Sequence, residues 1–170
     1  MKTTLKLNLL TSRKNQFSDK YETLFTASSS SCDLGSGWTS FSHTGGCYKF
    51  FSAKVTWHEA DRSCKSLGGD LPSITDKATN DFLVKLHPHV SWIGLRQHPN
   101  EGSWTALGAW TDGSPWCFQN WFEGEPNDAG GHEDFAVINW GKVQGVPQSV
   151  GNGKWNDHRS NKKYEYFCQK

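Results

Sequence analysis

The chain has 170 residues, enough for one ordinary domain with a short tail. Its 18 Lys and Arg balance 17 Asp and Glu, so a net charge of +1 gives no overall attraction to nucleic acid or to an anionic membrane. No apolar run approaches the ~20 residues of a membrane helix, so membrane insertion is not expected. The near-zero net charge likewise gives no reason to expect nucleic-acid binding. Nine Trp and 17 Gly favour a loop-rich α+β domain over a helical bundle.

Residues 1–31 are predicted to be an N-terminal leader or flexible tail, and residues 32–170 the folded domain. The first part carries five Lys or Arg against two acidic residues, a net charge of +3, and ends in a run of serines. Its opening residues alternate between polar and apolar side chains and lack the continuous apolar stretch of a secretory signal. This segment therefore does not by itself assign a compartment.

Short strands alternate with turns along the domain. Apolar patterning predicts strands at 37–41, 46–51, 91–95, 135–138 and 164–168, with an extended segment at 71–74. The first two strands form a hairpin that a Cys32–Cys47 disulfide would staple. Between residues 96 and 157 the chain consists mostly of turn formers with scattered tryptophans. A long irregular stretch in a compact domain is usually functional.

Two helices are expected, each after a recognisable start signal. Thr56 and Glu59 have the spacing of a capping box, and Gly68-Gly69 ends the helix that follows. A second helix is predicted at about 76–86. The side chains expected to face the core are Trp57, Ala60, Cys64 and Leu67 in the first helix and Ala78, Phe82 and Leu86 in the second.

The five cysteines are widely and unevenly spaced, without a CxxC pair or zinc-finger pattern. In a small Trp-rich domain this spacing favours disulfides and an oxidising compartment, hence a secreted or extracellular protein. Because five is odd, at least one thiol is left over. It is buried and inert, exposed and reactive, or paired with another chain.

No Lys or Arg lies between Arg96 and Lys142, although seven acidic residues do. Unpaired carboxylates repel one another in a compact fold, so this stretch is either a solvated acidic loop or a cation site. Three short segments offer carboxylates and amide carbonyls, namely Glu125-Pro126-Asn127, Glu133-Asp134 and Trp155-Asn156-Asp157. Oxygen donors of this kind suit Ca²⁺, whereas Zn²⁺ would require His or Cys. A cis bond before Pro126 would direct two of these side chains to one point.

These segments resemble a C-type lectin-like domain of the long form, from about Cys32 to Gln169. The matching motifs are Cys32…Trp38…Cys47-Tyr48, Thr56-Trp57-x-Glu59-Ala60…Cys64, Gly69-x-Leu71, Trp92-Ile93-Gly94-Leu95, Trp110-x-Asp112-Gly113, Asn120-Trp121, Gly124-Glu125-Pro126-Asn127, Glu133-Asp134, Trp155-Asn156-Asp157 and Phe167-Cys168. The resemblance implies an α+β fold with two helices, two small antiparallel sheets and a long ligand-binding loop. It also implies a Cys64–Cys168 disulfide and leaves Cys117 unpaired.

In sugar-binding relatives, the positions filled here by Glu125, Asn127, Glu133, Asn156 and Asp157 bind one Ca²⁺ and the sugar. The resemblance therefore implies a calcium-dependent lectin, without enzymatic activity, whose Ca²⁺ is completed by two adjacent sugar hydroxyls. The Glu-Pro-Asn order is the mannose type, which takes equatorial 3- and 4-hydroxyls as in mannose, glucose, GlcNAc and fucose. A second calcium site, where relatives have one, would use Glu101, Asp128, Glu133 and Asp134. A homo-oligomer is a plausible assembly because single sugar sites bind weakly.

The sequence departs from the family pattern at two framework positions. Phe135 and Ser160 stand where a second core disulfide would have its cysteines, and packing of Phe135 is expected to compensate in part. Lys154 and His158 flank the predicted site, while His43, His58, His87 and His89 are expected at the surface.

The alternative function is a protein-, ice- or mineral-binding module that holds a structural calcium and no sugar.

Overall fold

The computed structural model describes residues 32–97, 104, 109–142, 144, 145, 147 and 151–170, so the leader predicted at 1–31 lies outside the described residues. The described elements in chain order are η1 (Leu34–Ser36), β1 (Thr39–Phe41), β2 (Gly46–Val55), α2 (Trp57–Ser66), α3 (Lys77–Leu86), β3 (Ser91–Arg96), β4 (Ala109–Trp110), β5 (Phe135–Ile138), β6 (Trp155–His158) and β7 (Tyr164–Gln169). None of the helices described is long and apolar enough to span a membrane.

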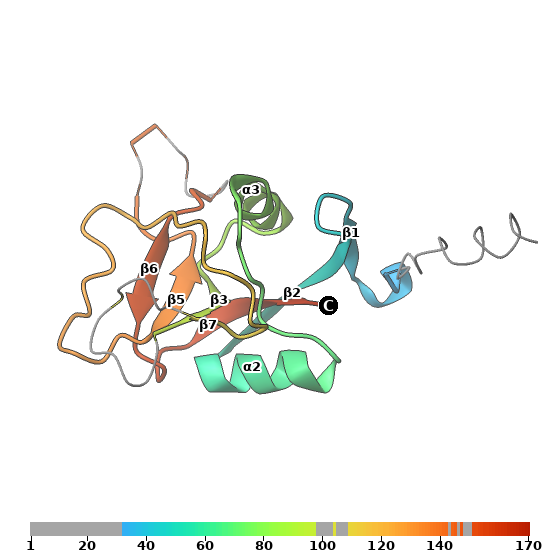
Figure 1. Ribbon diagram of the computed structural model, residues 1–170, viewed down its shortest axis with the longest axis horizontal. Helices are drawn as coiled ribbons and strands as arrows, with labels where there is room; N and C mark the ends of the chain where they lie inside the picture. Colours follow the sequence, from blue (N-terminus) through green and yellow to red (C-terminus); the bar gives the residue numbers. More distant parts are fainter. Residues whose placement is uncertain (1–31, 98–103, 105–108, 143, 146, 148–150) are drawn as a thin grey trace, which may run out of the picture. The chain divides into compact units, whose positions relative to one another are not determined.

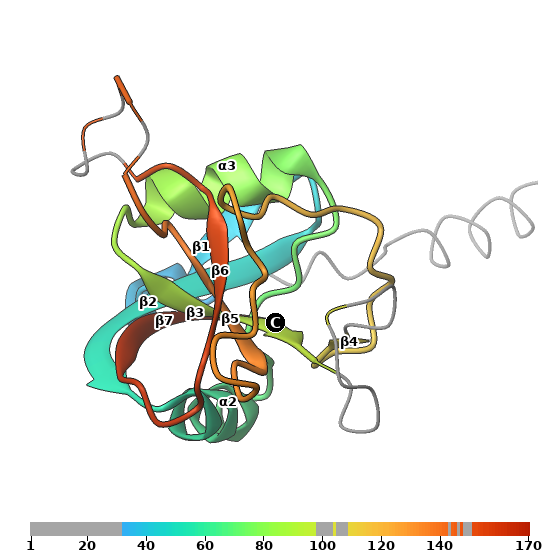
Figure 2. The ribbon, with the colours of Figure 1, turned by 90° about the vertical axis from the view of Figure 1, so that its left-hand side faces the viewer.

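The α+β class and the two helices are confirmed. The strands do not form two separate antiparallel sheets, however, because they join in one seven-stranded mixed sheet of order β1-β2-β7-β3-β5-β6, with β4 paired to β3. The parallel pairing of β3 with β7 connects the two halves. Figures 1 and 2 show α2 and α3 on opposite faces of this sheet.

Each face of the sheet has its own hydrophobic core, because side chains alternate along the strands. On β3, Trp92 packs into the core beside α2 and Ile93 into the core beside α3. On β7, Tyr166 and Phe167 divide in the same way. Five tryptophans are buried in these cores, namely Trp38, Trp57, Trp92, Trp110 and Trp155.

Helix α2 begins as predicted. The Thr56 hydroxyl accepts a bond from the Glu59 N–H, and the Glu59 side chain accepts one from the Thr56 N–H, which completes the capping box. Trp57, Ala60 and Cys64 are buried, but Leu67 is 41% exposed, so the prediction that it faces the core is wrong. The helix ends at Ser66, and Leu67 therefore no longer follows the helical repeat.

The prediction for helix α3 is correct only in part. Phe82 and Leu86 are half-buried and pack against the core, but Ala78 is exposed, and the buried residues of the helix are Thr79, Asn80 and Leu83. The reason is a distant partner, because Asn80 Oδ1 accepts the indole N–H of the fully buried Trp155 at 2.8 Å. A buried indole N–H needs an acceptor, and this need places a polar residue on the inner face.

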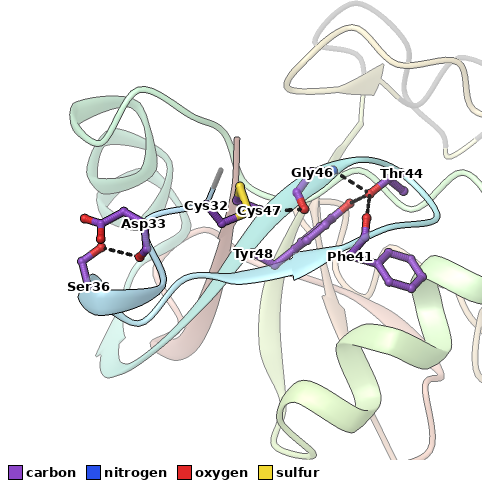
Figure 3. Close-up of a disulfide and its surroundings, with 8 residues drawn as sticks. All are labelled: Cys32, Asp33, Ser36, Phe41, Thr44, Gly46, Cys47 and Tyr48. Carbon is purple, nitrogen blue, oxygen red and sulfur yellow. Dashed lines mark hydrogen bonds between the residues drawn. A yellow bond between two sulfur atoms is a disulfide. The ribbon is translucent and has the colours of Figure 1, made fainter. Parts of the chain in front are cut away.

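Both expected disulfides are present, Cys32–Cys47 and Cys64–Cys168. Figure 3 shows the hairpin at the first of them, where the Thr44 hydroxyl lies 3.2 Å from the Tyr48 hydroxyl and 3.4 Å from the carbonyl oxygen of Phe41, to which it donates. Cys47 and Lys170 exchange two backbone bonds, of 2.8 and 3.0 Å. Cys32 and Lys170 are therefore both joined to Cys47, at the β1–β2 side of the sheet.

Candidate functional site

Strand β6 at the opposite edge of the sheet carries two of the predicted ligand residues. Its first residue, Trp155, fixes the neighbouring loop through the main chain, because its N–H donates to the carbonyl of Asn120 at 2.9 Å and its carbonyl accepts from Phe122 at 2.8 Å. The carbonyl of Phe122 in turn accepts the N–H of Glu125 at 2.9 Å. A buried aromatic anchor thus sets where the Glu-Pro-Asn turn begins.

Asp157 ties this turn to β6. The fully buried carboxylate accepts the backbone N–H of Asn127 at 3.2 Å and that of Asp128 at 2.8 Å. The peptide bond before Pro126 is cis. The Glu-Pro-Asn turn and the Asn-Asp pair, about 30 residues apart in the sequence, therefore meet at one place.

Glu133 closes the same loop from its other end. Its Oε2 accepts the N–H of Ala129 at 3.0 Å, and its own N–H donates to Asp128 Oδ1 at 3.0 Å. The indole N–H of Trp104 donates to the Glu133 carbonyl at 2.9 Å, and the Glu133 side chain is only 11% exposed. The loop thus holds a nearly buried carboxylate without a lysine or arginine partner among the described residues.

The electrostatics of the cluster indicate a need for positive charge. The pKa of Glu125 is raised from 4.5 to about 7 by burial, then by the nearby carboxylates of Asp157 and Glu133. Within the described part of the chain, Glu125 Oε2 and Asn156 Oδ1 are buried and have no hydrogen-bond partner. Buried acceptors of this kind are costly unless something satisfies them, and a hard cation with oxygen ligands would do so. The residues present therefore fit a Ca²⁺ ion.

The family model of the Lectin C-type domain matches residues 53–170. The chain belongs to the C-type lectin domain family. C-type lectin domains are in general binding modules, and no enzymatic family is indicated for this one.

Relatives and solved structures agree with the assignment. The chain is 34% identical to the versican core protein of Rattus norvegicus over 137 residues, which are 79% of this chain but only 4% of versican. The cow CD23 carbohydrate-recognition domain, crystallised in the presence of GlcNAc2Man3 oligosaccharide, superposes with a TM-score of 0.63 at 33% identity, covering 78% of this chain and 92% of that one. A calcium-independent type II antifreeze protein superposes with a TM-score of 0.63 at 22% identity, covering 79% and 91%, and shares the fold alone.

The second cation site implied for this C-type lectin domain is only partly described, because Glu101 lies outside the described residues. Among the residues the structure does describe, Asp128, Glu133 and Asp134 do not form a group whose ligand oxygens all lie within 4.8 Å of one another. The carboxylates of Glu125, Glu133 and Asp157 do not form such a group either. Opposite oxygens of a calcium shell are about 5 Å apart, so the five-residue set does not require that closeness.

His158 is more involved than its sequence position suggested. Its Nδ1 lies 3.5 Å from Glu133 Oε1, and its Nε2 lies 3.3 Å from Asn156 Nδ2 and 3.1 Å from the Tyr164 hydroxyl. One imidazole therefore contacts two of the five predicted ligand residues. Strand alternation places residues 156 and 158 on one face, and this signal could have identified it. Lys154 instead donates to Asn120 Oδ1 at 2.8 Å.

Phe135, one of the two departures from the family pattern, and the left-over thiol of Cys117 also have structural outcomes. Phe135 packs against the Trp57 ring with a centroid distance of 4.5 Å. Cys117 is free and exposed, and its Sγ lies 3.3 Å from the carbonyl of Thr75, so it is not a buried core thiol. It lines an aromatic pocket of about 340 Å³ together with Trp104 and neighbouring residues.

Proposed function

We propose that this C-type lectin domain is a calcium-dependent carbohydrate-binding module and not an enzyme. The observation that carries the proposal is the pair of buried, unpartnered oxygens, Glu125 Oε2 and Asn156 Oδ1, in a set that would hold Ca²⁺ through Glu125, Asn127, Glu133, Asn156 and Asp157. Likeness to the cow CD23 domain, crystallised with an oligosaccharide, supports a glycan as the ligand. The paired cysteines support a secreted or extracellular location.

Each residue of the set would contribute to sugar recognition according to the hydrogen bonds its side chain can accept or donate. Bound Ca²⁺ would supply the positive charge that draws in two neighbouring sugar hydroxyl oxygens. The carboxylates of Glu125 and Glu133 would accept hydrogen bonds from the sugar hydroxyls, while the amides of Asn127 and Asn156 would donate N–H to the same hydroxyl oxygens. Asp157, which already accepts two loop N–H groups, holds the turn in place.

The proposed sugars have equatorial 3- and 4-hydroxyls, as in mannose, glucose, GlcNAc and fucose. An acidic residue at 125 with an amide at 127 is the mannose-type order, and the reversed order, Gln then Asp, is the galactose type. A single exposed site of this kind binds a monosaccharide with roughly millimolar affinity. Several copies acting together would provide useful avidity, so we also propose a homo-oligomer.

Retention on mannose-agarose tests the proposal. Wild-type protein in millimolar Ca²⁺ is expected to be retained and then released by EDTA or free mannose, but not by galactose. Glu125→Gln should abolish retention, whereas Glu123→Gln, a change at an exposed acidic residue two positions earlier, should not. If the protein binds Ca²⁺ by calorimetry but is not retained, the cation is structural and the ligand is a protein, ice or mineral surface instead.

A further inference from the structure

We propose that His87, His89 and Glu165 form a site for a transition-metal ion of the Zn²⁺ type, separate from the oxygen-rich loop. One ring nitrogen of each histidine and one oxygen of Glu165 all lie within 4.8 Å of one another. The Nδ1 atoms of His89 and His87 lie 2.9 and 4.0 Å from the same atom, Glu165 Oε2. Imidazole nitrogen is a ligand for Zn²⁺, Cu²⁺ and Ni²⁺ but not for Ca²⁺, so the two sites would select different ions.

The spacing of the three groups suits a tetrahedral ion. Zinc bonds of 2.0–2.1 Å at tetrahedral angles place neighbouring ligand atoms about 3.3 Å apart. The two histidine–carboxylate separations of 2.9 and 4.0 Å lie on either side of this value, and the two histidine nitrogens lie within 4.8 Å of each other, so modest movements of the rings would bring the three ligand atoms around one ion. The His89 side chain is 60% exposed, which leaves one coordination position open to water or another ligand.

Three contacts already hold the ligands in place. The ring of His87 stacks on Phe50 with a centroid distance of 3.5 Å and an interplanar angle of 8°. The amide of Asn139 donates to the carbonyls of both His87 and His89, each at 3.1 Å, and so fixes the segment that carries the two rings. Glu165 is buried on β7, where it pairs in register with β3. Ligands on supported elements lose little freedom when an ion binds.

A simple ion pair does not account for the arrangement. The bond between His89 and Glu165 would satisfy the carboxylate with one histidine. The second imidazole nevertheless lies with its Nδ1 4.0 Å from the same oxygen, where it accepts the His89 backbone N–H at 3.4 Å, and the two rings meet edge-on with a centroid distance of 4.4 Å. Two imidazoles converging on one nearly buried carboxylate oxygen are the donor set of a metal site with three protein ligands.

Titration with zinc in saturating Ca²⁺ tests the proposal, using the full chain without a histidine tag. A chromogenic chelator in competition is expected to report one Zn²⁺ per chain, and Co²⁺ should give the intense visible absorption of a four-coordinate site. His89→Asn and Glu165→Gln should each weaken zinc binding at least about 100-fold. Asn139→Ala, which removes a positioning contact, should weaken it about tenfold.

The controls separate this site from other histidines and from the calcium loop. His58→Asn changes an exposed histidine that contacts two aromatic rings and no carboxylate among the described residues, and it should bind zinc as wild type does. Glu125→Gln should also keep full zinc affinity, because it touches only the proposed calcium site. Urea denaturation of each metal-free variant checks that the fold is intact. Equal zinc affinity of folded His89→Asn and His58→Asn, or no stoichiometric binding by wild type, would overturn the proposal.

Discussion

Glu125 is expected to make the calcium-free domain less stable as the pH rises. An acid with a higher pKa in the folded than in the unfolded chain binds more protons when folded, so the free energy of unfolding falls as the pH rises between the two values. For Glu125 the window runs from 4.5 to about 7. Between about pH 5 and about pH 8, this pKa difference lowers the free energy of unfolding by about 2.5 kcal/mol. Partial solvent exposure of the side chain reduces the effect to about 2 kcal/mol.

Urea denaturation in EDTA, with the disulfides intact, measures this effect when wild type and Glu125→Gln are compared at both pH values. The change in stability of Glu125→Gln between the two pH values must be subtracted from that of wild type. Burial lowers the pKa values of His87 and His158, and their contributions to the free energy of unfolding near pH 6 have the opposite sign. Glu125→Gln should be more stable than wild type by about 2 kcal/mol at the higher pH. Saturating Ca²⁺ should stabilise wild type by about 2.7 kcal/mol at 100 times Kd and leave Glu125→Gln largely unchanged.

Glu123→Gln serves as the control, since this exposed carboxyl is two residues away and should follow the wild-type pH dependence. The reasoning is refuted if wild type and Glu125→Gln lose the same stability between the two pH values in EDTA. Burial and the neighbouring carboxylates of Asp157 and Glu133 would then not raise the pKa of Glu125, and the electrostatic basis for a cation at this place would be removed.

Three further substitutions test a buried hydrogen bond, an aromatic contact and an exposed thiol. Asn80→Leu leaves the buried Trp155 indole N–H without an acceptor and should cost about 1–3 kcal/mol in urea denaturation, part of which Trp155→Phe should restore in the double variant. Phe135→Ala should cost about 2 kcal/mol by removing the ring packed on Trp57, and a change below 0.5 kcal/mol would show that this ring does not replace the missing disulfide. Cys117 should react with a thiol reagent in the folded protein, one equivalent per chain, and Cys117→Ser should abolish the reaction without altering stability.

Local signals in the sequence predicted most of the fold and much of the candidate site. The capping box at Thr56 depends on neighbours three residues apart, and the structure forms both of its hydrogen bonds. The segments around Glu125, Glu133 and Asp157 were each recognised by their residue types, and the loop brings them together through main-chain bonds.

Features that depend on distant partners were not predicted. Asn80 lies on the inner face of α3 because its acceptor is needed by an indole 75 residues later, which no helical pattern records. His87 and His89 were expected to be ordinary surface residues, yet His87 is half-buried and both converge on Glu165, 76 residues after His89. Local sequence shows only a His-Pro-His segment, and the parallel pairing of β3 with β7 supplies the carboxylate.

The adjacent positions of Cys32 and Lys170 have a mechanical consequence. A pulling force applied between these two points would act on the Cys32–Cys47 disulfide, the backbone bonds between Cys47 and Lys170, and the ladder of β2 with β7. The proposed ligand loop lies beside β6, at the far edge of the sheet (Figure 1). Tension between these two points would thus be carried by the disulfide and the β2–β7 pairing and not by the proposed ligand loop.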